Sequence, residues 1–423
     1  MRIFTTLLLA LISLNLFAQD TIKIMQYNLL NYGNTTSWCT TENNNMNDKD
    51  IYLKTIINYV KPDIFTVNEM AGNTYVIQRL MDSTLNVNGI DYYKKANYTG
   101  SYLVNMLYYN SEKLILESQD FINTTPRIID IYKLYYNSPD LSTMNDTAFI
   151  FCIVAHLKAG TGTSEQNERA NSTNMVMNYL DSINTPGNYF FMGDLNVYTS
   201  SENAFQNLIN FSNSQICFND PINEIGSWHD NSSYSSYHTQ STHTTSGCAS
   251  SGGMDDRFDF ILISNNILNG TDKVKYIANT YKALGQDGQR LNQTINNPTN
   301  NSIPSNIADA LYGMSDHIPV ILNLKIEQTP AIINNIHNNK KIEIIIQNPV
   351  KDKLNIYLEL NKKSKINIRI LSLSGQVLIK KQINNISKYV YFSIPLNNIK
   401  TGMYILKITD KYHNQIIKKF IKM

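Results

Sequence analysis

Charged residues are scarce in this chain of 423 residues. They make up 17% of it, against 42% hydrophobic residues, and abundant Asn, Ser, Thr and Tyr supply neutral polarity instead. This balance excludes a disordered chain, because disorder combines low hydrophobicity with high net charge. It favours a globular, β-rich, extracellular protein. The length predicts at least two domains, because single cores stop growing at a smaller size.

Long apolar runs are missing beyond residue 18, so no later segment is expected to span a membrane. Residues 1–18 themselves have the pattern of a secretory signal peptide. Arg2 supplies the positive start, residues 4–16 form a short apolar stretch, and Ala18 offers a small residue for cleavage before Gln19. A membrane anchor is the alternative, but no stop-transfer pattern follows. The lack of a cysteine at the cleavage point counts against a lipoprotein.

Cysteine is also rare, with Cys39, Cys152, Cys217 and Cys248 as the four examples. An even number in an exported chain permits disulfides, and three pairings are possible. A bridge between Cys217 and Cys248 would hold the polar segment before residue 259. Cys152 lies inside an apolar run and is alternatively a buried free thiol.

The two parts of the chain have opposite excesses of charge. Residues 327–423 contain 17 Lys and Arg against 5 Asp and Glu, whereas residues 1–326 contain 19 against 29. A nuclease that relies on non-specific phosphate attraction is usually basic around its groove. The acidic first part therefore counts against nucleic acid, although the candidate site itself contributes some of the acidity.

Six short motifs follow or close runs of β-prone apolar residues, so a rigid sheet would aim their polar side chains. In chain order they are Tyr-Asn-Leu-Leu-Asn with Asn28, Val-Asn-Glu-Met with Glu69, Ala-His-Leu-Lys with His156, Gly-Asp-Leu-Asn with Asp194 and Asn196, Arg-Phe-Asp-Phe with Asp259, and Ser-Asp-His-Ile-Pro-Val with Asp316 and His317. Together these carboxylates, imidazoles and amides indicate a site for hydrolysing a phosphate ester.

The set and its order resemble the endonuclease/exonuclease/phosphatase family, which includes deoxyribonuclease I-like nucleases, abasic-site endonucleases, inositol-polyphosphate phosphatases and neutral sphingomyelinases. The resemblance covers residues 22–326 and implies a four-layer α/β sandwich, in which two packed mixed sheets are flanked by helices. Apolar runs fit its strands at residues 22–27, 64–67, 149–155, 189–192, 258–263 and 319–324. Stretches of helical period at residues 51–60 and 167–180 fit its helices.

By this resemblance Glu69 binds a divalent cation, which is Mg²⁺, Mn²⁺ or Ca²⁺. Mg²⁺ prefers oxygen ligands and keeps several waters, so one or two carboxylates and a substrate phosphate suffice. Asp316 would add the second carboxylate, directly or through water, and Asn28 a neutral contact near phosphate and metal. The cation would polarise a phosphoryl oxygen.

The resemblance also makes Asp259 the partner that orients His317 and raises its pKa. Spacing alone leaves the neighbouring Asp255 and Asp256 open as partners. Asp194 would align or deprotonate the attacking water, and the Asn196 amide would donate to the phosphate.

Gly193 is expected to allow a tight turn that places Asp194 and Asn196 on one side. His156 could protonate the leaving oxygen or bind phosphate, and Arg127 resembles a phosphate-contacting arginine of the nuclease branch. No acidic partner for His156 is evident in the sequence.

Two departures from the family pattern stand out. Leu30 occupies a position that is acidic in abasic-site enzymes, so a metal contact is lost there. The polar stretch at residues 228–253 and the segment at 285–292 have no family counterpart and are expected to shape substrate choice. His229, His238 and His243 in that stretch lack Cys or Asp at zinc-ligand spacing, so a polar loop is the simpler interpretation.

After a linker at residues 327–341, seven short strands are expected in residues 342–423, which predicts a small all-β sandwich. Asn348-Pro349, Leu373-Ser374-Gly375-Gln376 and Gly402-Met403-Tyr404 resemble the C-terminal sorting domain of the type IX secretion system. This implies contact with that machinery, export across the outer membrane of a Bacteroidetes-like bacterium, and removal of the domain. A permanent carbohydrate- or surface-binding module is the alternative.

The sequence thus predicts a secreted or cell-surface, monomeric, metal-dependent phosphodiesterase, with residues 19–326 as its catalytic domain and DNA or RNA as its substrate. A sphingomyelinase-like or inositol-phosphate phosphoesterase is the alternative enzyme. A non-enzymatic adhesin requires all these site residues to be idle.

Overall fold

The computed structural model describes residues 19–100, 102–138, 141, 147–327, 343–346, 348–359, 364–372, 376–386, 389–411 and 415–423. The chain divides into two compact units, Met1–Pro330 and Ala331–Met423. The predicted signal peptide and residues 328–341 of the predicted linker lie outside the described residues, as do residues 373–375 of the predicted sorting motif.

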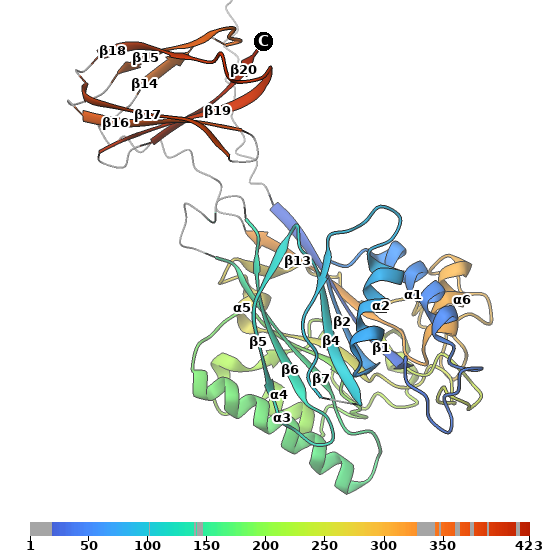
Figure 1. Cartoon of the computed structure of the whole chain (residues 1–423). Helices are drawn as coiled ribbons and strands as arrows, with labels where there is room; N and C mark the ends of the chain where they lie inside the picture. Colours follow the sequence, from blue (N-terminus) through green and yellow to red (C-terminus); the bar gives the residue numbers. More distant parts are fainter. Residues whose placement is uncertain are drawn as a thin grey trace, which may run out of the picture. The chain divides into compact units, whose positions relative to one another are not determined.

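The first unit contains two mixed sheets (Figure 1). The strands of the first sheet are β1 (Gln19–Tyr32), β2 (Ile64–Ala71), β3 (Tyr93–Lys95), β4 (Leu103–Asn110), β11 (Val274–Tyr276), β12 (Lys282–Ala283) and β13 (Val320–Glu327). Their order is β11-β13-β1-β2-β4-β3, and β12 also pairs with β13. Strands β1 and β2 run parallel, while β1 and β13 run antiparallel.

The strands of the second sheet are β5 (Leu114–Ile122), β6 (Ile129–Tyr136), β7 (Phe149–His156), β8 (Tyr189–Asp194), β9 (Phe218–Asn219) and β10 (Asp259–Ser264). Their order is β5-β6-β7-β8-β10-β9. Strands β7 and β8 run parallel, and β10 runs antiparallel to β8. Two sheets of this kind bring several parallel strand ends to one edge of the unit.

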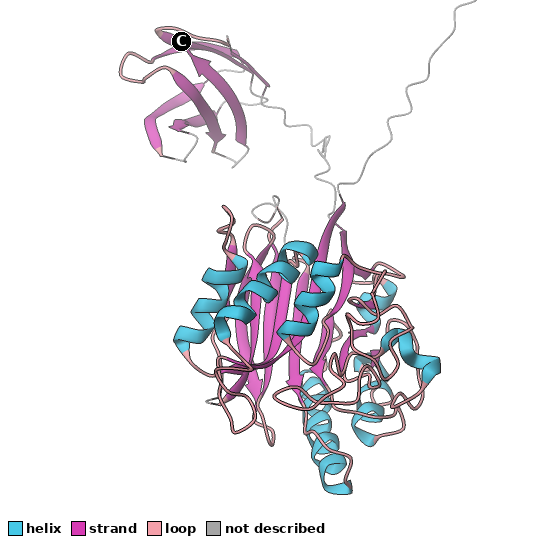
Figure 2. Cartoon of the chain, turned by 90° about the vertical axis from the view of Figure 1, so that its right-hand side faces the viewer, coloured by secondary structure: helices cyan, strands magenta, loops and turns pink. Residues whose placement is uncertain are grey.

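Helices cover the outer faces of the two sheets (Figure 2). Against the first sheet pack α1 (Met46–Val60), α2 (Thr74–Leu80) and α6 (Ser305–Met314). Against the second sheet pack α3 (Thr163–Ile183) and α4 (Asn203–Ile209). The remaining short helices are η1 (Met81–Leu85), η2 (Ser214–Ile216), η3 (Ser232–Tyr237) and α5 (Asn265–Asn269). The predicted four-layer α/β sandwich is confirmed.

The alternation of side chains along β1 shows how the layers are filled. Ile22 and Ile24 belong to the core between the two sheets, whereas Tyr27 belongs to the core beneath the helices. Because successive residues of a strand point to opposite faces, Gln26 and Asn28 continue the inter-sheet face. Both are fully buried. The inter-sheet layer therefore changes from apolar to polar along the strand.

The second unit is a small all-β sandwich, as predicted. Its strands are β14 (Glu343–Ile346), β15 (Lys353–Glu359), β16 (Ser364–Ser372), β17 (Val377–Ile386), β18 (Tyr389–Pro395), β19 (Gly402–Asp410) and β20 (Gln415–Lys422). One sheet has the order β14-β15-β18 and the other β17-β16-β19-β20. Alternating residues such as Ile356 and Ile368 fill the core between them. In neither unit does a described helix have the length and hydropathy needed to cross a membrane.

Candidate active site

On several strands, the side chains that face the core between the two sheets form a row of alternate residues, and each row ends in a polar side chain. The rows are Ile64, Thr66 and Asn68 on β2; Cys152, Val154 and His156 on β7; Phe190, Met192 and Asp194 on β8; and, in reverse, Ile263, Ile261 and Asp259 on β10. A period of two residues carries each row from core to edge. Because β10 is antiparallel to β8, its first residue meets the last residue of β8.

The strand register places three predicted site residues side by side on the second sheet. His156 is paired with Asp194, and Asp194 is paired with Asp259. Asn28 reaches them from the first sheet, because its Nδ2 donates to Asp194 Oδ2 at 3.0 Å across a sequence separation of 166. This hydrogen bond joins the two sheets at the centre of the site.

Gly193 is required by close packing of the strands. It lies inside β8 with φ +140°, and a Cβ there would be 1.8 Å from the carbonyl oxygen of Ala155 on β7. The expected tight turn after the strand is therefore wrong. The glycine instead allows β7 and β8 to approach, which aligns His156 with Asp194.

Glu69 is held in place by its backbone and by two donors. Its φ is 58°, a left-handed conformation that is uncommon for a non-glycine residue and is often found at functional sites. Asn28 Nδ2 donates to its Oε1 at 3.1 Å, and the backbone N–H of Asn31 donates to its Oε2 at 3.0 Å. The carboxylate thus faces Asn28 and Asp194 in the interior of the site.

Lys49 stabilises the backbone next to Glu69, and it was not identified from the sequence. Its Nζ donates to the carbonyl oxygens of Leu29 and Leu30 at 2.8 and 2.5 Å. Burial lowers the pKa of Lys49 to about 7, although Asp316 and Glu69 act in the opposite direction. Its place on the apolar face of α1 is the signal that would have revealed it.

His317 and Asp259 form a buried pair, with His317 Nδ1 2.7 Å from Asp259 Oδ2. Burial disfavours the charged imidazole, but Asp259 and Asp194 outweigh this effect and raise the pKa of His317 well above its usual range. The nearby Asp256 pairs with His229 instead, at 2.8 Å. The geometry favours Asp259 among the three aspartates that spacing left open.

Asp194 lies between the two histidines. Its Oδ2 is 3.4 Å from His156 Nε2 and 3.7 Å from His317 Nε2. Burial raises the pKa of Asp194 to about 7, with Asp259 and Glu69 adding to the shift and His317 opposing it. A carboxyl with such a pKa can accept and release a proton near neutral pH.

Asn196 and Arg127 lie on the second-sheet side of the site. The backbone N–H of Asn196 donates to Asp194 Oδ1 at 3.1 Å, and its side-chain amide donates to the Leu157 carbonyl at 3.3 Å. Arg127 Nη1 donates to the same carbonyl at 3.2 Å. Both residues therefore lie near Asp194, with Arg127 acting on the backbone that follows His156.

His156 is buried, and no described carboxylate is hydrogen-bonded to its Nδ1. Its Nε2 lies 3.7 Å from Glu69 Oε1, and its Nδ1 has no hydrogen-bond partner among the described residues. Burial lowers the pKa of His156 well below its usual value, and the charges of Arg127 and His317 act in the same direction. The two histidines of the site therefore have opposite electrostatic surroundings.

Asp316 is held by the polar stretch at residues 228–253. Gln240 Nε2 donates to Asp316 Oδ2 at 3.1 Å and lies 2.7 Å from His317 Nε2, while the Ser250 backbone N–H donates to the same Asp316 oxygen at 2.9 Å. Only an uncharged His317 has an Nε2 lone pair that can accept from Gln240. Protonation of His317 and this contact therefore exclude one another. No motif in the sequence had indicated Gln240 or Ser250.

A disulfide between Cys39 and Cys248 anchors the same stretch to the loop after β1. The suggested pairing of Cys217 with Cys248 is therefore wrong. Cys217 is a buried free thiol that donates to backbone carbonyls after α4, next to the second sheet. Cys152 is a buried free thiol in the core between the sheets, which agrees with one of the two alternatives for it.

The three histidines of the polar stretch have separate surroundings. His238 contacts the carbonyl oxygens of Trp228 and Met254, and the ring of His243 stacks on Tyr312 at 4.0 Å. His229 is the member that lies among carboxylates.

Among the residues that the structure describes, two groups of side chains have the donor atoms and spacing to hold a cation. In the first, Glu69, His156 and Asp194 each offer a ligand atom, and these atoms lie within 4.8 Å of one another. The second consists of His229, Asp255 and Asp256, of which His229 is exposed. The first group coincides with the predicted site, and the unpartnered Asp316 Oδ1 lies 3.9 Å from His317 Nε2 beside it.

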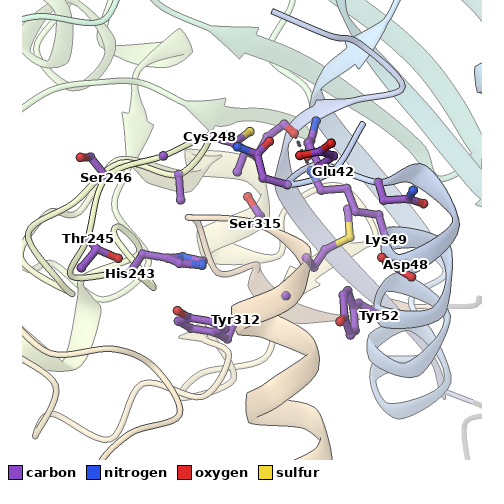
Figure 3. A pocket seen from close by; sticks show the side chains of 18 residues that line it. Glu42, Asp48, Lys49, Tyr52, His243, Thr245, Ser246, Cys248, Tyr312 and Ser315 are labelled. Carbon is purple, nitrogen blue, oxygen red and sulfur yellow. Dashed lines mark hydrogen bonds between the residues drawn. The ribbon is translucent and has the colours of Figure 1, made fainter. Parts of the chain in front are cut away.

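A polar pocket of about 350 Å³ adjoins the site (Figure 3). It lies between α1, the end of α6 and residues 243–249. Lys49 and Ser315 connect it to the site, because Ser315 Oγ donates to the Asn28 carbonyl at 2.8 Å and directly precedes Asp316.

The fold and these residues define a two-sheet α/β protein with a buried carboxylate and histidine site at one sheet edge, joined to a β-sandwich. A family model described as the secretion system C-terminal sorting domain matches residues 345–423. This segment is therefore such a domain, and the predicted secretion to the cell surface or extracellular space is confirmed. No curated protein matches the chain.

Solved structures similar to the chain include proteins of the family that residues 22–326 resemble. An endonuclease/exonuclease/phosphatase from Bacteroides vulgatus is 11% identical, with 73% of this chain and 100% of that chain covered and a TM-score of 0.46. The human Nocturnin catalytic domain with bound sulfate is 12% identical, with 73% and 98% covered and a TM-score of 0.46. A Beutenbergia cavernae endonuclease/exonuclease/phosphatase is 10% identical, with 95% and 99% covered and a TM-score of 0.42. Likenesses this weak assign no role to any residue of this chain.

Proposed function

We propose that the chain is a secreted, divalent-metal-dependent phosphodiesterase that cleaves extracellular DNA or RNA. The observation that carries the proposal is the convergence of Asn28, Asp194, Asp259 and His317 on one buried point, although they are far apart in the sequence. A purely structural core has no need to bury two carboxylates, an imidazole and an amide together at the ends of strands.

Asp194 takes the proton of the attacking water in this mechanism. Its pKa near 7 suits that step, and Asn28 and the Asn196 backbone N–H fix the direction of its carboxylate. His317 donates from Nε2 to a phosphoryl oxygen, and Asp259 stabilises the positive charge that His317 then carries. The Gln240 amide must leave Nε2 for this contact to form.

Glu69, Asn28 and Asp316 are our proposed ligands for the cation, which is Mg²⁺, Mn²⁺ or Ca²⁺. Their oxygen atoms suit these hard cations, and Asp316 Oδ1 is a buried acceptor with no partner among the described residues. When bound, the cation would offset the negative charge that develops on the phosphoryl oxygens during the reaction. His156 and the Asn196 and Arg127 side chains would bind the phosphate or assist the leaving oxygen.

The test is a substrate panel with the purified chain. Plasmid DNA, RNA, sphingomyelin, inositol phosphates and a bis-aryl phosphate are each incubated with Mg²⁺ or Mn²⁺, with and without chelator. Chelator-sensitive cleavage of a nucleic acid is expected. Lack of any nucleic acid cleavage alongside turnover of sphingomyelin or inositol phosphate would favour the alternative enzyme, which the acidic first part of the chain supports.

A substitution control separates an enzyme from an adhesin with the same fold. His317→Ala should abolish turnover while the protein remains folded. His243→Ala removes a histidine that stacks on Tyr312 and has no part in the mechanism, so its turnover should stay close to wild type. Wild-type protein without activity on any member of the panel would refute the proposed function.

A further inference from the structure

Lys49 occupies a position where a lysine is unexpected. It is 3% exposed and lies in the first turn of α1, on the face that also carries Leu53, Ile56 and Val60. These three residues pack into the core beneath the first sheet. A lysine on such a face must find polar partners, because burial of an unpaired amine is costly.

The partners of Lys49 belong to the segment in which β1 leaves its regular pairing. The register between β1 and β2 shifts between Asn28 and Tyr32, and Leu30 and Asn31 both have left-handed backbones, with φ of 46° and 52°. Two consecutive non-glycine residues in this region are strained and need support from their surroundings. The Lys49 amine supplies that support by binding the carbonyl oxygens of Leu29 and Leu30.

The same short turn orients two proposed cation ligands. The Leu30 backbone N–H donates to Asn28 Oδ1 at 3.0 Å, and the Asn31 backbone N–H donates to Glu69 Oε2 at 3.0 Å. The left-handed turn after Asn28 directs both of these N–H groups to the ligand oxygens. The amine of Lys49 thus lies one hydrogen bond from the turn and two from the Glu69 carboxylate.

We propose that Lys49 is a positioning residue that presets Glu69 and Asn28 for cation binding by clamping the left-handed turn after β1. The inference rests on the proposed function, in which these residues hold the cation. Figure 3 places Lys49 at the wall of the polar pocket, so space lies beside its side chain. A guanidinium at this position could therefore still reach the two carbonyls.

The test measures Mn²⁺ binding by calorimetry on the full chain, without substrate. Lys49→Met keeps the apolar stem and removes the donors, and its dissociation constant should rise at least about tenfold, the usual effect of losing a group that orients a ligand. Lys49→Arg should bind Mn²⁺ within about threefold of wild type, because it retains donors for both carbonyls.

Lys23→Met is the matched control. Lys23 also lies where β1 and α1 meet, and its Nζ donates to a backbone carbonyl, that of Val60 at the end of α1. This contact is away from the turn that follows Asn28. This variant should bind Mn²⁺ within about twofold of wild type. A tenfold loss in both methionine variants would reveal a general packing effect and overturn the proposal.

Two other results would also overturn it. One is a folded Lys49→Met protein with wild-type Mn²⁺ affinity, and the other is a folded Lys49→Arg protein that has lost affinity. If Lys49→Met fails to fold, the arginine variant still decides. Wild-type protein that binds Mn²⁺ but cleaves nothing would refute the proposed function. The role of Lys49 is decided by Mn²⁺ affinity alone, so the two failures are distinguishable.

Discussion

Replacing Asp259 with Asn removes the negative charge that faces His317 Nδ1 at 2.7 Å. Both side chains are at least 97% buried, so solvent cannot compensate for the loss. Leaving one partner of a buried ion pair alone costs about 3–5 kcal/mol. Without Asp259 the buried imidazole stays neutral, and forming the charged His317 that donates to the phosphoryl oxygen then adds this cost to the barrier. The added cost corresponds to a loss of about 10²- to 10⁴-fold in kcat.

The pH dependence supplies a second signature of the same substitution. Asp259 helps to raise the pKa of His317 above its usual range, against the effect of burial. The wild-type imidazole therefore keeps its proton as the pH rises past its ordinary value, and loses it only at the raised pKa. In Asp259→Asn burial is less opposed, so the alkaline limb of the activity profile should move to lower pH.

The assay measures kcat and kcat/KM for a bis-aryl phosphate between about pH 5 and 10, at one fixed and saturating concentration of the divalent cation. Asp256→Asn is the matched control, because Asp256 also accepts from a histidine at 2.8 Å, but from the half-exposed His229. Its activity should change less than about threefold, as expected for an exposed pair. An Asp259→Asn enzyme with near wild-type kcat and an unmoved alkaline limb would refute the assigned role of the pair.

Three further predictions concern stability and delivery. Cys39→Ser opens the disulfide that anchors the Asp316-binding loop, and should lower the free energy of unfolding in urea by about 2–5 kcal/mol. Cys217→Ser, at a free thiol, should cost under about 1 kcal/mol, and equal losses would contradict the argument. Gly193→Ala places a methyl 1.8 Å from a backbone oxygen and should cost at least about 3 kcal/mol, whereas Gly247→Ala, with no atom within 4 Å, is the control; similar melting temperatures would argue against the close approach. Deleting residues 327–423 should keep specific activity within a factor of about two, or about 0.5 kcal/mol, while stopping secretion, and a truncated chain that still appears outside the cell would disprove this division of labour.

The strand-end residues of the site could be predicted because their signal is local. Asp194 follows Phe190 and Met192 at intervals of two, and a strand with this period points all three to the same face. The change from apolar to polar within such a row already marks the edge of a core. The same local alternation predicted the small C-terminal sandwich, whose core is built from residues such as Ile356 and Leu406.

The residues that hold the site together were not predictable in this way. Gln240 and Ser250 belong to a polar stretch without period. Ser250 reaches Asp316 through its backbone N–H, which carries no signal in the sequence, and Gln240 through a side-chain amide that no motif marks. Lys49 was missed because a lysine in an amphipathic helix usually lies in water, and only its position on the apolar face of α1 marks it as an exception. The pairing of Cys248 with Cys39 depends on which loops meet above the sheet edge.

The sequence by itself determined which side chains end the strands, which part of the chain is acidic and which part is basic. The tertiary structure alone decided that Asn28 would meet Asp194 over a separation of 166 residues and that Asp259 would meet His317 over 58. The physical reason is that the alternation of side chains along a strand is set by residues adjacent in the sequence. In contrast, the order of strands in a sheet and the packing of two sheets depend on burial and loop closure over the whole unit.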